Sequence, residues 1–150
     1  MVAVIQRVST ASVYIEGSIH SAIDCGLLIL LGISHNDNET DADWLCSKIC
    51  QMRLFADTEN KMNLNLSDIS GDLLIISQFT LLASTKKGNR PSFIEAARPE
   101  IAIPLYNYFI RVCEQMLNKP VFTGQFGADM KVTLVNNGPI TIIIDSKNKQ

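Results

Sequence analysis

The sequence is poor in the residues on which most simple active sites and metal sites depend. It has two histidines, His20 and His35, neither of which stands close to a cysteine, and no two of its four cysteines form a Cys-x-x-Cys pair. No apolar run approaches the roughly 20 residues that a membrane-spanning helix needs. The first residues also lack the layout of a secretory signal peptide. We therefore expect an intracellular, cytoplasmic protein with no metal, no cofactor and no membrane partner.

The cysteines that are present fit a reduced protein interior. Cys46 and Cys50 are spaced i, i+4 on a predicted helix, so a buried helix face accounts for both without any chemistry. Because no secretory signal precedes them, disulfide bonds are not expected. Cys25 and Cys113 are interpreted in the same way, as free thiols.

The chain also lacks a net charge that would attract nucleic acid over its whole surface. Lys and Arg number 13 against 15 Asp and Glu, which gives a formal net charge of −2 at pH 7. Any contact with RNA must therefore come from a local patch, and we expect no DNA partner. The best candidate is the loop at residues 85–90, where Lys86, Lys87 and Arg90 bring three cations together. A solvated turn is the alternative.

Apolar residues are plentiful and predict the fold class. They make up 47% of the 150 residues against 19% charged ones, a balance typical of a globular protein. With no repeat, linker or low-complexity segment, residues 1–150 are predicted to form a single domain. Apolar patterns predict strands at residues 2–8, 11–15, 19–23, 27–33, 73–82, 130–136 and 140–145.

Two helices are predicted between these strands, which makes this an α+β protein. The first begins near Thr40 or Asp41, either of which could cap it, and the second carries Pro104 in its first turn. The residues expected to face the core are Trp44, Leu45, Ile49 and Met52 on the first helix, and Leu105, Phe109, Val112, Cys113 and Met116 on the second.

Two short polar segments at the ends of apolar runs are the best candidates for function. Residues 77–80 close the run that begins at Leu73, and residues 137–141 lie between the apolar runs at residues 132–135 and 142–144. A buried strand needs no hydroxyl or amide at its tip for packing, so Ser77, Gln78 and Thr80 could bind a molecule that enters a pocket. The alternative is that they end the strand and hydrogen-bond to neighbouring backbone.

Neither polar segment contains a residue that could act as a general base. Ser77 and Thr80 could each be a nucleophile, but no His, Asp, Glu or Lys lies in either segment. A triad completed in space by His20 or His35 is an alternative that the sequence leaves open. The backbone offers another route: the amides of Phe79 and Thr80, if unpaired at the strand tip, could stabilise a developing oxyanion.

The Gly138-Pro139 pair has two interpretations. Asn-Gly is a strong hairpin signal, so a turn between two strands is the simpler one. Proline directly after it is awkward for a two-residue turn, because its nitrogen donates nothing to the ladder. A cis bond would turn both carbonyls to one side, where they could face a pocket. X–Pro bonds are cis in only about 5–6% of cases, so the sequence leaves the isomer open.

These segments, taken together with several others, resemble one enzyme family, the D-aminoacyl-tRNA deacylases, also called D-tyrosyl-tRNA deacylases. The similarity runs essentially end to end, and no matched segment is missing. The segments that carry it are Ile5-Gln6-Arg7-Val8, Lys61-Met62-Asn63-Leu64, Ser77-Gln78-Phe79-Thr80-Leu81, Arg90-Pro91-Ser92-Phe93, Thr123-Gly124-Gln125-Phe126-Gly127-Ala128-Asp129-Met130 and Asn137-Gly138-Pro139-Ile140-Thr141.

The resemblance implies a fold, a reaction and an assembly. The fold is a mixed, barrel-like sheet flanked by two main helices. The reaction is hydrolysis of the ester between a D-amino acid, or mischarged glycine, and the 3′ end of tRNA, a chiral proofreading step in translation quality control. The assembly is a homodimer with active sites at the subunit interface. Gly138 and Pro139 of one subunit would reject L-aminoacyl groups in the other subunit's pocket by steric clash, steadied by Arg7.

The resemblance also assigns roles to the residues around that pocket. Phe126 and Met130 would line the space for the terminal adenosine, with Ala97 near it, as aromatic rings commonly hold single-stranded RNA bases. The basic loop at residues 85–90 becomes a candidate for tRNA phosphate contacts. The residues expected around the scissile ester are Ser77, Gln78, Phe79 and Thr80.

Several mechanisms remain open under this interpretation. Attack by water is favoured, with backbone amides holding the oxyanion and the substrate's ribose 2′-OH assisting. One alternative is Thr80 as a covalent nucleophile. Others are a module that binds aminoacyl-tRNA without cutting it, against which the acidic balance argues, and a hydrolase of small amino-acid esters, which would leave Phe126 and the basic loop without a purpose.

Overall fold

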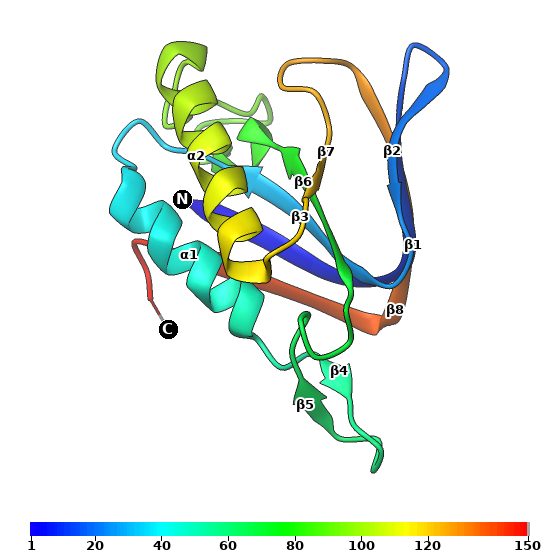
Figure 1. Cartoon of the computed structure of the whole chain (residues 1–150). Coiled ribbons are helices and arrows are strands. Elements are labelled where there is room, and N and C mark those ends of the chain that lie inside the picture. Colours follow the sequence, from blue (N-terminus) through cyan, green and yellow to red (C-terminus); the bar gives the residue numbers. More distant parts are fainter. Residues whose placement is uncertain (150) are drawn as a thin grey trace.

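One long strand, β1 (Val2–Ile15), organises the sheet because it has three antiparallel partners (Figure 1). The structure is a computed structural model that describes residues 1–149. The partners of β1 are β2 (Ser18–Ile23), β3 (Gly26–Gly32) and β8 (Met130–Asp145). Two further strands extend the sheet beyond β3 in parallel, β6 (Asp72–Ser77) and then β7 (Phe122–Thr123). The sheet is therefore mixed.

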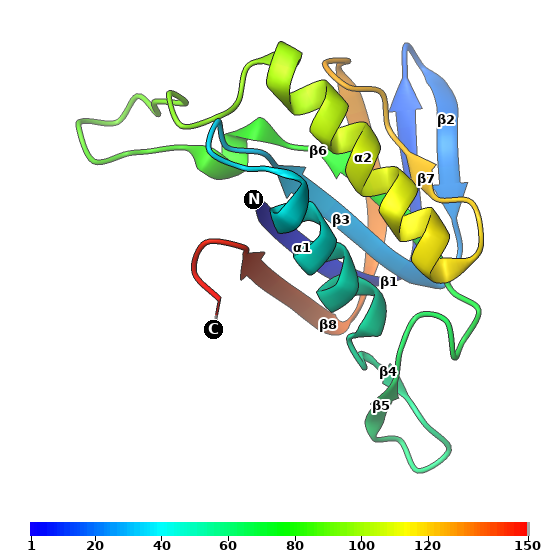
Figure 2. The same ribbon diagram turned by 60° about the vertical axis from the view of Figure 1, so that its left-hand side comes forward.

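The edges of this sheet curl toward each other and nearly close a barrel. β2 lies at one end of the strand order and β7 at the other, yet the two strands run side by side in both views (Figures 1 and 2). The Ser21 hydroxyl donates a hydrogen bond of 2.7 Å to the Thr123 carbonyl across the gap. A side chain thus joins strands that share no ladder, and the expected barrel-like α+β fold is confirmed.

Both faces of β3 and β6 are buried, which explains their uninterrupted apolar sequences. Side chains alternate between the faces of a strand. On β3, Leu27, Ile29 and Leu31 pack with the helices, whereas Leu28 belongs to a second cluster inside the barrel with Val13 of β1. The helices α1 (Glu39–Gln51) and α2 (Pro99–Leu117) lie together over one face of the sheet (Figure 2). Among residues 1–149, no helix combines the length and apolar character needed to cross a bilayer.

The first helix begins earlier than the sequence pattern predicted. Its N-cap is Asn38 rather than Thr40 or Asp41: Asn38 Oδ1 accepts hydrogen bonds from the backbone N–H groups of Thr40 at 2.9 Å and Asp41 at 3.3 Å. The Asp41 carboxylate accepts the Asn38 N–H in return at 3.0 Å, which completes a capping box. Of the residues predicted to face the core, Leu45 and Ile49 are fully buried; Trp44 and Met52 are half-buried and pack against its edge.

The second helix also starts before its predicted position. Pro99 occupies its first turn, where a missing N–H costs nothing, and Pro104 lies inside the helix instead of in its first turn. The predicted stripe is buried at Leu105, Phe109 and Cys113. It fails at its far end, where the Met116 side chain is 44% exposed.

Two of the predicted strands end differently in the structure. β6 stops at Ser77, not at Leu82, and the chain then turns into a short 3₁₀ helix, η1 (Phe79–Leu82). Residues 137–139 are not a hairpin turn, because the segments before and after them both pair antiparallel with β1 as parts of the single strand β8. Residues 137–140 form an excursion from that strand. A small hairpin of β4 (Phe55–Ala56) and β5 (Met62–Leu64) projects from the body (Figure 1).

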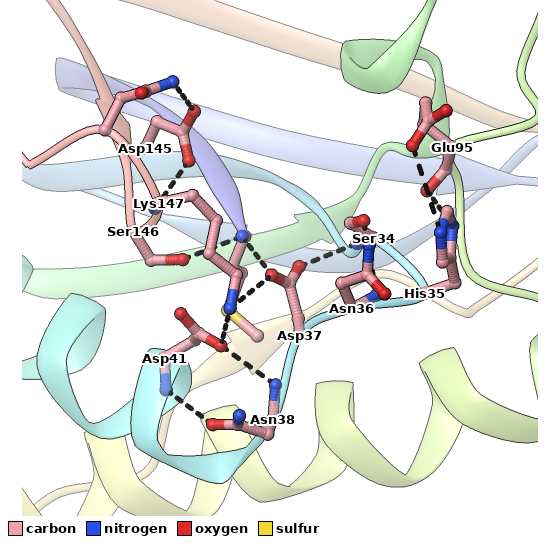
Figure 3. Close-up of polar contacts among 12 residues, drawn as sticks. Ser34, His35, Asn36, Asp37, Asn38, Asp41, Glu95, Asp145, Ser146 and Lys147 are labelled. Atoms are coloured by element: carbon pink, nitrogen blue, oxygen red, sulfur yellow. Dashed lines mark hydrogen bonds and ion pairs between the residues drawn. The ribbon is translucent and has the colours of Figure 1, made fainter.

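A buried polar cluster anchors the start of β1 (Figure 3). The α-amino group of Met1 lies 2.6 Å from Asp37 Oδ1 and 2.8 Å from Ser146 Oγ. The second carboxylate oxygen of Asp37 accepts the Ser34 N–H at 2.7 Å, and Lys147 Nζ lies 2.7 Å from Asp41 Oδ2. The cluster therefore ties β1, the turn before α1 and the end of β8 to one point.

Candidate functional site

A cavity of about 320 Å³ opens where β3 and β6 end. It lies between this edge of the sheet, the start of α2 and the segment that leads into β8. The sequence-predicted site residues that line it are Ser77, Gln78, Phe79, Ala97, Phe126 and Met130. The tertiary fold thus brings together three segments that are distant in the sequence, and the cavity is lined mainly by apolar side chains, as small-molecule sites usually are.

The end of β6 presents unpaired backbone donors beside this cavity. The Gln78 N–H still bonds to the Leu31 carbonyl at 2.7 Å, but the N–H groups of Phe79 and Thr80 donate to no group within residues 1–149. The turn packs closely against Gly32, where a Cβ would lie 3.1 Å from both the Gln78 carbonyl oxygen and Leu81 Cβ. Two free amide donors are what a developing oxyanion requires.

The side chains of this segment are arranged less favourably for covalent catalysis. Thr80 is exposed and does not line the cavity, and its hydroxyl oxygen accepts a hydrogen bond from Gln78 Nε2. Within the described residues, the single titratable side chain on the cavity wall is Asp129, which sequence reasoning missed. Its carboxylate is 88% exposed and lies 2.7 Å from Lys131 Nζ. Neither His20 nor His35 lines the cavity, so no His-based triad forms there.

The opposite wall is held by aromatic packing. Phe126 meets Tyr106 edge to face at 5.9 Å between ring centroids, and the buried Tyr106 hydroxyl donates to the Ile75 carbonyl at 2.8 Å. Burial raises the pKa of Tyr106 far above its usual value, so the phenol stays protonated. Met130 reaches the wall because Gly124 leaves room: a Cβ on Gly124 would overlap Met130 Sδ. These contacts hold Phe126 and Met130 in place on an apolar wall.

The Gly138-Pro139 pair does not lie in the cavity of its own chain. The Gly138–Pro139 peptide bond is cis. The pair belongs to the excursion opposite Arg7, which pairs with Leu27 on β3, whereas the cavity begins at Leu31. Four residues of extended strand span about 13 Å. One chain therefore keeps the two predicted polar segments apart.

Arg7 holds the excursion at its beginning. Its Nε donates to the Asn137 carbonyl at 3.1 Å, and its Nη1 donates to the Leu54 carbonyl at 2.7 Å. Gly138 has a φ of +128°, and a Cβ there would lie 3.1 Å from the Ile140 nitrogen and 3.2 Å from Arg7 Nη2. Both the backbone angle and the space therefore require glycine at this position.

The basic loop lies next to the site but outside the cavity. It is closed by paired backbone hydrogen bonds of 2.8 and 2.9 Å between Ser84 and Ser92, and Figure 2 shows it extending from the body just after η1. Lys86, Lys87 and Arg90 are exposed. The loop is joined to the site through the neighbouring rings of Phe79 and Phe93, whose centroids are 5.1 Å apart.

A barrel-like α+β fold with an apolar cavity, free backbone donors at the end of a strand and no histidine on the cavity wall defines the class of protein. Comparison with known proteins identifies the family. Residues 4–145 match the family described as D-Tyr-tRNA(Tyr) deacylase. The D-aminoacyl-tRNA deacylase of Cytophaga hutchinsonii is 64% identical over 150 residues, which is 100% of both chains. That of Flavobacterium psychrophilum is 59% identical, again over 100% of both. The chain belongs to the D-aminoacyl-tRNA deacylase family of hydrolytic enzymes.

Two solved structures resemble the fold. One, titled c-Myc DNA Unwinding Element Binding Protein, is 37% identical, covers 97% of this chain and 98% of its own, and superposes with a TM-score of 0.91. A second, titled as a probable eukaryotic D-amino acid tRNA deacylase, has a TM-score of 0.81 over 95% of this chain and 97% of its own. Its identity of 14% makes it a likeness of fold alone.

Proposed function

We propose that this protein hydrolyses the ester between a D-amino acid, or mischarged glycine, and the 3′ end of tRNA, releasing free tRNA and the amino acid. The observation that carries the proposal is the cavity at the end of β6, with the unpaired amide of Phe79, which lines it, and that of the adjacent Thr80, in a chain that matches deacylases over its full length. The reaction would be a cytoplasmic quality-control step of translation, performed by residues 1–150 as a single deacylase domain.

The chemistry follows from what the site offers and what it lacks. Water attacks the ester carbonyl, and the carbonyl oxygen, as it becomes an oxyanion, receives the N–H groups of Phe79 and Thr80. Gln78 and Ser77 orient the ester, and the ribose 2′-OH of the substrate assists the attack. Holding the ester and water in one geometry supplies much of the rate enhancement. Thr80 acting as a covalent nucleophile is disfavoured because the residue does not line the cavity and its hydroxyl oxygen accepts a hydrogen bond from Gln78 Nε2.

Selection of the D-form requires a second subunit. Gly138 and Pro139 are too far along the sheet to reach the cavity of their own chain, so a homodimer in which they enter the neighbouring cavity would complete each site. Their backbone carbonyls would meet the α-carbon substituents of an L-aminoacyl group and leave space for the D-form or for glycine. The excluding groups are backbone carbonyls, which carry no side chain that could adapt to the substrate. They would therefore exclude the L-form whatever the side chain of the amino acid.

The rest of the tRNA end would be held by the remaining predicted residues. The terminal adenine packs against Phe126 and Met130, with Ala97 leaving room for it at the cavity wall. The exposed cations of the basic loop, Lys86, Lys87 and Arg90, contact backbone phosphates. The net charge of −2 makes this contact local, so we expect binding to aminoacyl-tRNA and not to DNA, although one structural relative is named as a DNA unwinding element binding protein.

The decisive experiment compares the release of D- and L-tyrosine from the same charged tRNA. We expect rapid release of the D-form and little release of the L-form. Equal rates would overturn the chiral part of the proposal. Tight binding of the charged tRNA without release of either form would instead identify a binding module. In the same binding measurement, displacement of the tRNA by duplex DNA would contradict our expectation that DNA is not a partner.

A further inference from the structure

The excursion at residues 137–140 is held at its end by side chains other than Arg7. The register of β8 against β1 pairs Thr141 with Gln6 and Asn136 with Val8. Arg7 is thus the one β1 residue opposite the four residues of the excursion. The regular ladder is interrupted there, and the direction of the Gly138 and Pro139 carbonyls depends on other contacts.

The first backbone donor after the proline is captured by Asn136. Gly138 has no side chain and Pro139 has no N–H, so the excursion carries few groups that could hold it in place. The Ile140 N–H donates to Asn136 Oδ1 at 3.1 Å. This bond joins Asn136, directly before the excursion, to Ile140, its last residue, and so brings the two ends of the excursion together.

Thr141 braces the Asn136 side chain in the orientation that this bond needs. Asn136 Nδ2 donates to Thr141 Oγ1 at 2.9 Å, and Gln6 Nε2 donates to the same oxygen at 3.3 Å. With Nδ2 turned toward Thr141, Oδ1 points at the Ile140 N–H. Arg7 holds the Asn137 carbonyl at the start of the excursion, so the two ends are fastened by independent contacts.

We propose that Asn136, oriented by Thr141, is a positioning residue that sets the direction of the Gly138 and Pro139 carbonyls and thereby the preference for D- over L-aminoacyl groups. This inference rests on the proposed function. Asn136 itself touches no substrate. Its loss leaves the Arg7 bond to the Asn137 carbonyl as the remaining side-chain hydrogen bond to the backbone of the excursion within residues 1–149. The carbonyls then move and the L-form is excluded less sharply, while the amides at Phe79 and Thr80 are unaffected.

The test uses three variants and one control in the full-length protein. Asn136→Ala removes both hydrogen bonds. Asn136→Asp keeps an oxygen for the Ile140 N–H, and the Thr141 hydroxyl can donate to its carboxylate. Thr141→Val removes the brace alone. Thr133→Val is the matched control, because Thr133 is an exposed threonine of the same strand with no side-chain hydrogen bond among residues 1–149.

Two readouts are measured for each variant: the ratio of D- to L-tyrosine release from charged tRNA, and the hydrogen exchange rate of the Ile140 amide. For Asn136→Ala we expect faster exchange and a roughly tenfold fall in the ratio, mainly through faster release of the L-form. Asn136→Asp should restore most of the ratio, Thr141→Val should fall in between, and Thr133→Val should match the wild type. If Asn136→Ala does not fold, Thr141→Val and Asn136→Asp carry the comparison.

The outcomes separate this inference from the proposed function. Wild-type protein that releases both forms equally overturns the chiral part of the proposed function, and the exchange rates then still test the hydrogen bond by themselves. Wild-type protein that discriminates, with an unchanged ratio in a folded Asn136→Ala variant, overturns the positioning role. Unchanged exchange of the Ile140 amide in that variant overturns the hydrogen bond on which the role depends.

Discussion

Replacing Asp37 by asparagine tests whether the buried cluster at the start of β1 stabilises the fold. The side chain of Asp37 is fully buried and lies 2.6 Å from the α-ammonium of Met1, which is also fully buried. The same carboxylate accepts the Ser34 N–H. Asp37→Asn removes the negative charge, keeps the shape, and leaves the buried ammonium with the Ser146 hydroxyl but without its charged partner.

The size of the effect follows from the burial of both charges. Removing one member of a buried ion pair costs about 3–5 kcal/mol, because the remaining charge is neither paired nor hydrated. Asparagine can still accept one hydrogen bond, so we expect a loss of about 3 kcal/mol in the free energy of unfolding. For a chain of this size that corresponds to a fall of roughly 6–12 °C in Tm.

The assay is urea and thermal unfolding at one fixed protein concentration, which matters if the protein dimerises. Glu59→Gln is the matched control, since Glu59 and Lys61 also lie 2.6 Å apart but are 70% and 73% exposed. The control should lose less than about 1 kcal/mol. Equal losses in the two variants, or no loss at Asp37, would refute the argument from burial.

Three further predictions concern catalysis, specificity and pH. Thr80→Ala should retain deacylation within about tenfold of the wild type; complete loss with intact tRNA binding, or a trapped acyl-enzyme, would favour a covalent mechanism. Gly138→Ala should destabilise the protein by about 1–3 kcal/mol in urea unfolding, because φ is +128°, and should lower the D/L ratio. Burial by itself would raise the pKa of Asp41, but hydrogen bonds from Lys147, Ser146 and Asn38 outweigh it and lower the pKa below its ordinary 3.8. The Asp41 carboxylate therefore binds a proton less tightly in the folded state than in the unfolded state. Its contribution to the free energy of unfolding is fully present above pH 3.8 and is lost as pH falls below that value. Acid unfolding of Asp41→Asn should lack that component, and an unchanged acid transition would contradict the assignment.

The sequence predicted the elements best where a single periodic pattern covers the whole element. The continuous apolar runs of β3 and β6 and the helical spacing of Leu45 and Ile49 all lie in the core as expected. Boundaries were less accurate. Asn38 caps α1 because Asp41 returns its hydrogen bond. Local sequence does not distinguish between Asn38, Thr40 and Asp41, because all three are residue types that cap helices well.

The nature of the excursion in β8 was beyond a reading of local sequence. Asn-Gly predicted a hairpin, but both flanking segments found the same antiparallel partner in β1. That choice depends on contacts between residues more than 120 positions apart, which no local pattern contains. Asp129 was missed for a similar reason, since the sequence shows a charged residue before a strand and only the fold places it on the wall of the cavity.

By itself the sequence determined the class of the fold, the apolar interior and the two polar segments of interest, because these depend on the spacing of neighbouring side chains. The tertiary structure decided where the two segments lie. Residues 77–80 end one strand beside the cavity, and Gly138 and Pro139 lie about 13 Å or more along the sheet opposite Arg7. The physical reason is strand register: pairing of β6 with β3, and of β3 and β8 with β1, fixes each segment at its own position along the sheet, so one chain keeps the two segments apart.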